Sequence, residues 1–93
     1  MIRSFKGKLA EALGNGRAAK GFPPDLVKVA TRKLAYLKRA RLLSDLAAPP
    51  GNRLESLQGN REGQHSIRIN DQWRICFVWR DGAADEVEIV DYH

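Results

Sequence analysis

The hydrophobic residues of this chain repeat with two different periods, and the change falls at the segment Ala48-Pro49-Pro50-Gly51. Before this segment apolar residues recur at helical spacing, along one side of a cylinder. After it they alternate with polar residues, which is typical of strands with one buried face. Helices followed by consecutive strands predict an α+β fold, with N-terminal helices packed on one face of a mainly antiparallel sheet.

The helical half is dominated by one amphipathic segment. Pro23-Pro24-Asp25 is a favourable start, because proline suits the first turn and an acid suits the positive end of the helix dipole. From Leu26 to Leu37 apolar residues follow the helical period, and the other side is rich in lysine and arginine. The expected helical segments are residues 8–13, 24–41 and 42–47.

The second half reads as a series of strands separated by turn residues. Trp73, Ile75, Phe77 and Trp79 share one face of a strand and predict its buried side. Asp81-Gly82 marks the turn into the last strand. The expected strands are residues 2–6 at a sheet edge, 53–57, 64–69, 73–79 and 86–91. Since no linker or repeat interrupts the 93 residues, we expect a single domain spanning 1–93.

Charge is distributed unevenly along the chain, whose net charge is +5. Residues 1–48 carry eleven Lys and Arg and three acids, whereas residues 49–93 carry five Arg and eight acids. A basic half favours a polyanionic partner, because neutralised phosphates release their counterions. Solvation of an exposed helix explains a charged stripe equally simply.

Several classes of protein are disfavoured by composition. The apolar runs are far shorter than the ~20 residues that cross a bilayer, and the first residues lack the apolar core of a signal peptide. The single cysteine, Cys76, excludes an internal disulfide and a multi-cysteine zinc site. We therefore expect a cytoplasmic protein. Two distant histidines and the lack of a glycine-rich nucleotide loop predict neither a metal nor an organic cofactor.

Two groups of residues are candidates for chemistry on RNA, which needs a base, an acid and a cation beside the phosphate. Asp91, Tyr92 and His93 end the chain, and histidine titrates near neutral pH. In a continuing strand Asp91 and His93 project to one side and Tyr92 to the other. Arg74 lies mid-strand, where its charge either pairs with an acid or receives phosphate. A frayed, exposed terminus is the competing interpretation of the last residues.

Three segments resemble the HigB branch of the RelE superfamily, the toxins of bacterial type II toxin–antitoxin pairs. They are Leu57-Gln58-Gly59-Asn60-Arg61-Glu62-Gly63, Asn70-Asp71-Gln72-Trp73-Arg74-Ile75-Cys76-Phe77 and Asp91-Tyr92-His93. With the start Met1-Ile2-Arg3-Ser4-Phe5 and the basic helix, the resemblance covers nearly the whole chain.

The resemblance implies a fold like that of microbial ribonucleases and cleavage of mRNA in the ribosomal A site, without a metal. Carried over by position, Arg74 stabilises the phosphate, and Asp91, Tyr92 and His93 form a C-terminal catalytic cluster in which His93 is the acid–base group. The resemblance also implies a HigA-like helix-turn-helix antitoxin, with operator DNA bound only through the toxin–antitoxin complex. The expected RNA-binding residues are Lys28, Arg32, Lys33, Lys38, Arg39, Arg61 and Arg68.

The chain departs from the family pattern at two positions. Many relatives have a lysine where this chain has Gln58, and some have a histidine near the position of Glu55. A missing cation leaves the phosphate less stabilised, so we expect a weak member of the family. Two other functions share the same composition: a non-catalytic RNA-binding or ribosome-binding module, and a protein-interaction domain whose basic helix docks an acidic segment.

Overall fold

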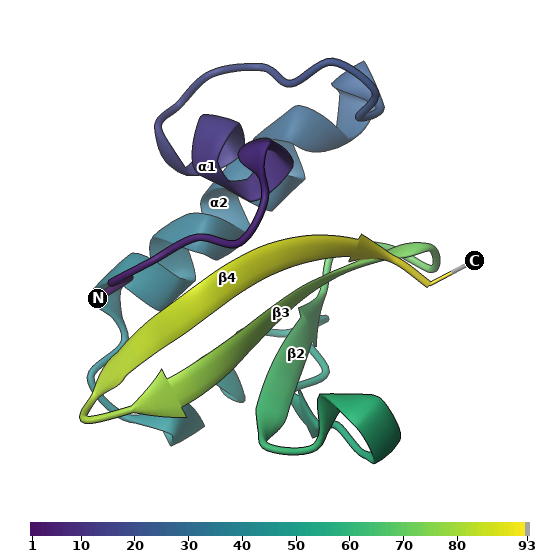
Figure 1. Cartoon of the computed structure of the whole chain (residues 1–93). Helices are drawn as coiled ribbons and strands as arrows, with labels where there is room; N and C mark the ends of the chain where they lie inside the picture. The colour runs from purple at the N-terminus through teal and green to yellow at the C-terminus, as the bar shows by residue number, and fades with distance from the viewer. Residues whose placement is uncertain (93) are drawn as a thin grey trace.

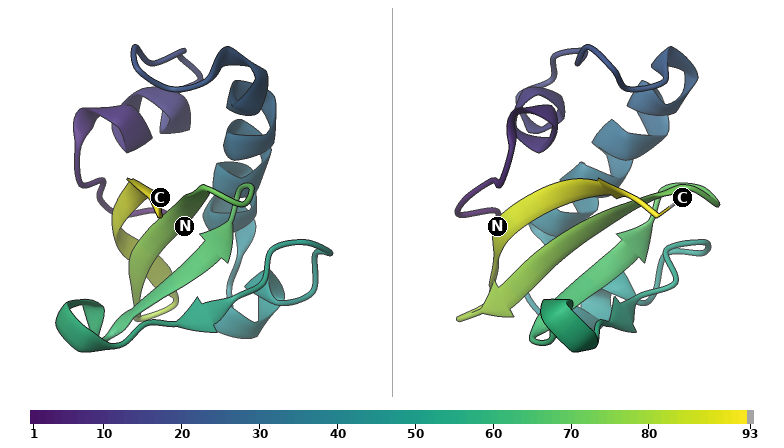
Figure 2. Two further views of the ribbon diagram at one scale, coloured as in Figure 1. Left: turned by 90° about the vertical axis from the view of Figure 1, so that its right-hand side faces the viewer. Right: turned by 45° about the vertical axis from the view of Figure 1, so that its right-hand side comes forward.

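The computed structural model describes residues 1–92, in which helices cover one face of a four-stranded antiparallel sheet (Figure 1). The strands lie side by side in chain order, so the sheet is a meander. Figure 2 shows α1 and α2 on the same side of this sheet. The predicted α+β architecture is confirmed. The strands are β1 (Glu55–Ser56), β2 (Gln64–Arg68), β3 (Trp73–Arg80) and β4 (Ala83–Asp91).

The helical layer consists of α1 (Lys8–Gly14) and α2 (Val27–Arg39). A 3₁₀ turn, η1 (Pro24–Leu26), leads into α2, and a second, η2 (Leu43–Leu46), follows it. The carboxylate of Asp45 accepts the N–H groups of Arg41 and Leu42, both at 3.0 Å, which holds the pKa of Asp45 below its ordinary value. Within residues 1–92 no helix has the length and apolarity needed to cross a membrane.

The hydrophobic core lies between α2 and the sheet. Ile75 and Phe77 are fully buried and face Leu34 and Leu37 of α2 within one cluster. Trp73 and Trp79 pack at the margins of the same cluster, and Trp73 meets Phe22 edge-on with ring centroids 5.0 Å apart. The predicted buried stripe of β3 is therefore confirmed. Because side chains alternate along a strand, Arg74 and Cys76 face away from the helices.

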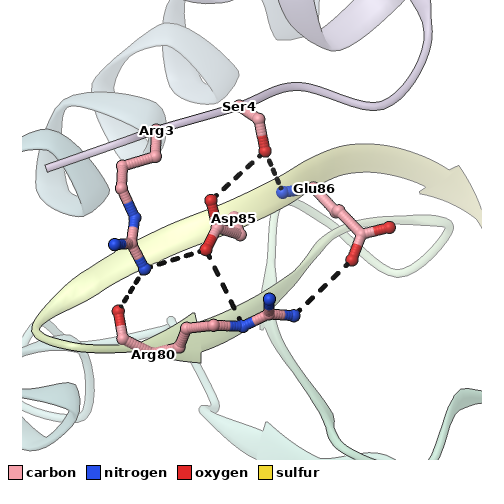
Figure 3. Close-up of polar contacts among 5 residues, drawn as sticks. All are labelled: Arg3, Ser4, Arg80, Asp85 and Glu86. Atoms are coloured by element: carbon pink, nitrogen blue, oxygen red, sulfur yellow. Dashed lines mark hydrogen bonds and ion pairs between the residues drawn. The ribbon is translucent and has the colours of Figure 1, made fainter.

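The N-terminal segment differs from the expected edge strand. Residues 2–6 form only isolated parallel bridges, Ile2 with Ala84 and Phe5 with Val87. Side chains complete the attachment (Figure 3): Arg3 donates to Asp85 at 2.9 Å and to the Arg80 carbonyl at 2.6 Å. The Ser4 hydroxyl accepts the Glu86 N–H at 2.8 Å. These contacts add to four backbone hydrogen bonds between residues 1–6 and β4.

A bulge in β4 explains why a ladder does not form there. Cys76 pairs with Glu88 and Val78 with Asp85, so two residues of β4 oppose Phe77. Glu86, one of the two, has φ 52°, in the left-handed region. An extra residue bends a strand and interrupts its pairing. The N-terminal segment follows this bend with backbone hydrogen bonds on either side of it, and side chains add to them.

Lys33 corrects the predicted basic stripe on α2. Its side chain is not on the outer surface, since the residue is only 4% exposed. The ammonium donates to the carbonyls of Gly51 at 3.2 Å and Arg68 at 2.5 Å. Lys33 follows Ala30 by three positions and precedes Leu37 by four, so the helical period places it beside the apolar stripe and not on the basic one. The two carbonyls accept hydrogen bonds from its charged end. The apolar part of the lysine side chain is buried, while its charged end reaches the two carbonyls.

Lys33→Met tests this assignment through pH. Burial, and then Arg32, Arg68 and Arg74, lower the pKa of Lys33 below its ordinary value of 10.5. The unfolded chain therefore binds this proton more tightly, so the stability of the wild type rises as pH approaches 10.5. Because the variant loses the hydrogen bonds to two carbonyls, its free energy of unfolding should be about 1–2 kcal/mol lower than that of the wild type at neutral pH.

Urea unfolding of both proteins from neutral pH to pH 10.5 measures the effect. The free energy of unfolding of the wild type should increase relative to Lys33→Met as pH rises. A constant difference between the two curves would contradict the buried, perturbed ammonium.

Candidate functional site

The face of the sheet turned away from α1 and α2, called here the open face, collects the candidate residues. Residues directly opposite one another on paired strands point to the same side. Ser66 pairs with Cys76 and with Glu55, and Cys76 pairs with Glu88. Arg74 pairs with Val90, and Tyr92 lies two residues further along. The open face therefore carries Glu55, Ser66, Arg74, Cys76, Glu88 and Tyr92.

Arg74 lies at the centre of the open face and is 9% exposed. Its Nε donates to Ser66 Oγ at 2.8 Å, and one terminal nitrogen donates to the Arg53 carbonyl at 2.7 Å. The same nitrogen lies 3.9 Å from a Glu55 carboxylate oxygen. A guanidinium has five N–H donors. Two are used in hydrogen bonds to residues 1–92, so the group is fixed while donors remain for an anion.

The backbone at Arg53 explains this geometry and the short β1. Strand pairing was expected from residue 53, but Arg53 has φ 46°, which directs its carbonyl to Arg74 instead of a ladder. The preceding residue is anchored at the same time. Asn52 donates through its side-chain amide to the Leu46 carbonyl at 3.0 Å, and its own carbonyl accepts the Arg68 N–H at 2.6 Å.

Tyr92 closes the open face over Cys76 and Arg74. Its hydroxyl lies 3.9 Å from the Cys76 sulfur, and its ring centroid is 5.9 Å from the Arg74 guanidinium carbon. Burial is the main cause that raises the pKa of both Cys76 and Tyr92. Both groups therefore stay protonated at neutral pH. Cys76 is fully buried although it lies on the open face.

Arg61 and Arg68 add further positive charge to the open face. Arg61, at the end of the turn η3 (Gly59–Arg61), donates to Glu88 and to the Gln64 side chain, both at 3.1 Å. The hydrogen bond with Glu88 is the main cause that raises the pKa of Arg61. Arg68 stands directly opposite Arg74 and is paired with Asp71. Both arginines were expected to bind RNA, and the structure groups them with Arg74.

The C-terminal candidates are divided between the faces. Asp91 pairs with Trp73, whose side chain contributes to the core, so Asp91 is directed to the helix side of the sheet. Its carboxylate accepts from the Gln72 side chain at 3.1 Å. The structure thus brings Tyr92 to Arg74 and separates Asp91 from both. The expected separation of Tyr92 from Asp91 is confirmed, and His93 lies outside the described residues.

The exposed cations of α2 form a second basic surface, away from the open face. This outer surface of α2 consists of Lys28, Arg32, Lys38 and Arg39. The Lys38 ammonium also donates to the Gly14 carbonyl at 2.6 Å and so ties α2 to α1. Among residues 1–92 no three His, Cys, Asp or Glu side chains are grouped so that they can hold a metal ion.

Ser66 and the Arg53 carbonyl were not identified as functional from the sequence. The alternation in strand 64–69 places Ser66 on the polar side, opposite its apolar neighbours. That pattern, combined with the register to β3, is the signal that identifies it as a partner of Arg74. No sequence signal identifies the Arg53 carbonyl, because its direction depends on a left-handed backbone at an arginine.

Comparison with known proteins points to one family. A family model described as the RelE-like toxin of the type II toxin–antitoxin system HigB matches residues 3–93. The chain is 41% identical over 85 residues to Toxin HigB-1 of Vibrio cholerae, covering 90% of each protein. It is 32% identical over 93 residues to Endoribonuclease HigB of Proteus vulgaris, covering both in full.

A solved structure supports the architecture alone. The chain superimposes on a mutant of YafQ from E. coli with a TM-score of 0.54. The match covers 98% of this chain and 93% of that one, at 15% sequence identity. The arrangement of helices and sheet is therefore shared with YafQ.

The cover that Tyr92 provides over Cys76 is testable by alkylation. Thiol reactivity follows access and thiolate content, so the folded wild type should react slowly with iodoacetamide. Tyr92→Ala should raise the rate by about tenfold, while Tyr92→Phe, which keeps the ring, should stay close to the wild type. Mass spectrometry under native conditions measures the rate. Equal rates for all three proteins would show that Tyr92 does not lie over Cys76.

Proposed function

The chain belongs to the HigB family of RelE-like toxins of type II toxin–antitoxin systems, and we propose that it is an endoribonuclease whose active site is the open face around Arg74. The observation that carries this proposal is the guanidinium of Arg74, fixed by Ser66 and the Arg53 carbonyl with donors left over. The name of the Proteus vulgaris relative, an endoribonuclease, supports the same activity.

The proposed chemistry is attack of a ribose 2′-oxygen on the adjacent phosphorus, with departure of the 5′-oxygen. Arg74 binds the non-bridging oxygens, where negative charge increases in the transition state. Glu55, 3.9 Å from Arg74, is placed to accept the 2′-OH proton, and His93 donates a proton to the leaving oxygen. No metal is required, because Arg74 supplies the cation and side chains move both protons.

The remaining site residues orient the substrate and the terminus. Tyr92 is 46% exposed, so its ring is available to stack on a base next to the scissile phosphate. Arg61 and Arg68 contact the neighbouring phosphates of the same strand. Asp91 orients the C-terminal residues from the other face of the sheet.

We place this reaction on the ribosome, with mRNA as the substrate. The outer surface of α2 and the open face lie on opposite sides of the sheet, so RNA has to contact the protein from two directions. Ribosomal RNA against α2 supplies salt-dependent affinity, and the ribosome holds the 2′-OH in line with the phosphorus. The protein therefore acts in the cytoplasm, and it should cleave free RNA poorly.

The family implies an antitoxin as partner. We further propose that this antitoxin is HigA-like, with a helix-turn-helix domain, and that the toxin reaches operator DNA only through the complex. Binding to operator DNA by the toxin alone would contradict this part of the proposal.

Substitution of Arg74 tests the site. Arg74→Ala should slow single-turnover cleavage on mRNA-programmed ribosomes by about 10²–10³-fold, and Arg74→Lys by less, since lysine keeps the charge without the fork of donors. Arg41→Ala, exposed beyond the end of α2, is the matched control and should cleave at the wild-type rate.

An unchanged rate for Arg74→Ala would refute the open face as the active site. Robust cleavage of naked RNA by the purified protein would refute dependence on the ribosome. A His93→Ala variant that binds ribosomes and inhibits growth as the wild type does would favour a non-catalytic ribosome-binding module.

Gln58→Lys tests the expected weakness of the enzyme. Gln58 is exposed and directly precedes η3, whose last residue, Arg61, lies on the open face. A lysine there adds a cation near the phosphate and should raise the single-turnover rate on ribosomes by about threefold to tenfold. Gln58→Glu is the control and should slow cleavage. If the lysine variant is no faster than the wild type, Gln58 does not account for weak activity.

A further inference from the structure

A third basic surface lies beside α1, apart from the open face and from the outer surface of α2. It is a groove of about 450 Å³ between α1 and the segment 15–21 that follows it. Figure 1 shows this segment looping past α1 in the helical layer, away from the sheet. The lining residues are Lys8, Leu9, Ala12, Arg17, Ala18, Ala19 and Lys20.

The charge of this groove is of one sign and uncompensated. Lys8, Arg17 and Lys20 are exposed, and none forms an ion pair or a side-chain hydrogen bond with residues 1–92. No acidic side chain lines the groove. By contrast, every arginine on the open face has a carboxylate within 4 Å. The cations of the groove thus lack the acidic partners that the arginines of the open face have.

The backbone of the segment adds unused hydrogen-bond donors. The chain is fixed at its start, where the Arg17 N–H donates to the Ala12 carbonyl at 2.9 Å. It is fixed again at its end, where the Phe22 N–H donates to Ala19 at 3.3 Å and the Phe22 ring enters the core. Between these points the N–H groups of residues 18–21 donate to no acceptor within residues 1–92. Exposed N–H groups beside cations are suited to carboxylates and peptide carbonyls.

The floor of the groove distinguishes a protein from a nucleic acid as the occupant. Leu9, Ala12, Ala18 and Ala19 provide an apolar floor of small side chains, with no aromatic ring on which a base could stack. Phosphates would satisfy the cations and leave this floor bare. A peptide that alternates acidic with small apolar side chains satisfies the cations, the N–H groups and the floor together.

We propose that this groove binds an acidic segment of the antitoxin. Its carboxylates pair with Lys8, Arg17 and Lys20, its backbone carbonyls accept the free N–H groups, and an apolar side chain rests against Leu9 and Ala12. The inference rests on membership of a toxin–antitoxin family and not on the proposed ribonuclease activity.

Charge reversal provides the test. The variant Lys8→Glu/Arg17→Glu/Lys20→Glu is titrated with the antitoxin of the same pair by calorimetry, at low and at high salt. The dissociation constant should rise by about 10–100-fold at low salt, and its salt dependence should decrease. Lys28→Glu/Arg32→Glu/Arg39→Glu, a reversal of equal size on α2, should bind antitoxin as the wild type does.

A second variant tests the groove without changing its charge. Ala18→Trp fills the groove from an exposed position and should also weaken the complex by at least about tenfold. Circular dichroism and urea unfolding show whether each variant is folded. Wild-type affinity of both groove variants would overturn the proposal. So would a loss of ribosome binding by the charge-reversed variant with unchanged antitoxin affinity, because the groove would then be a nucleic-acid site.

The result is independent of the active site. Arg74→Ala should bind antitoxin as the wild type does, whatever its effect on cleavage. Normal cleavage together with weakened antitoxin binding by the groove variants would support the groove as the antitoxin site. If none of the proteins, the wild type included, cleaves RNA, the proposed ribonuclease activity is refuted and the antitoxin-binding result still stands.

Discussion

The positive charge of Arg74, held in a nearly buried position, determines how the open face is built. An uncompensated guanidinium there would lower the stability of the fold by several kcal/mol, so its N–H groups need acceptors nearby. Ser66 accepts from Nε, the Arg53 carbonyl accepts from a terminal nitrogen, and Glu55 lies 3.9 Å away. Tyr92 places its ring beside the same group. A side chain compensated in this way is rigid and still carries donors for an anion, which is what stabilisation of a phosphate transition state needs.

The support of Arg74 continues through the sheet to the helical layer. Arg53 offers its carbonyl because the segment before it is anchored at two points. Asn52 donates to the Leu46 carbonyl, and Lys33 of α2 donates to Gly51. Lys33 also reaches the carbonyl of Arg68, the residue opposite Arg74. One buried ammonium therefore connects α2 with the backbone on two sides of the site, so the helices contribute to its geometry without contacting it.

The sequence was sufficient for the architecture and for the division of faces. A period of two fixes which residues of β3 point together, so the core stripe Trp73, Ile75, Phe77 and Trp79 and the outward position of Arg74 followed directly. The same rule separated Tyr92 from Asp91. These predictions depend only on alternation within one strand. Which residues are neighbours on adjacent strands depends in addition on the register between the strands.

What the sequence did not reveal depends on contacts between distant segments. Lys33 follows Ala30 by three positions and precedes Leu37 by four, so the helical period places it beside the apolar stripe. The carbonyls of Gly51 and Arg68, which make the burial of its charge favourable, cannot be read from that period. The N-terminal segment was expected to form an edge strand, but beside the bulge at Glu86 it forms isolated bridges with β4. The side chains of Arg3 and Ser4 add to the backbone hydrogen bonds there. The Arg53 carbonyl reaches Arg74 across 21 positions through a left-handed turn that arginine seldom adopts.

The most direct test is to observe the Arg74 guanidinium as RNA binds. Selective ¹⁵N labelling of arginine resolves the Nε–H signals in NMR spectra, and a short RNA with a 2′-O-methyl group at every ribose cannot be cleaved. We expect the Arg74 Nε–H, which is protected by Ser66, to exchange slowly with water before addition and to shift together with the Arg61 signal on titration. Shifts confined to the arginines of α2, with Arg74 unchanged at saturation, would contradict the account.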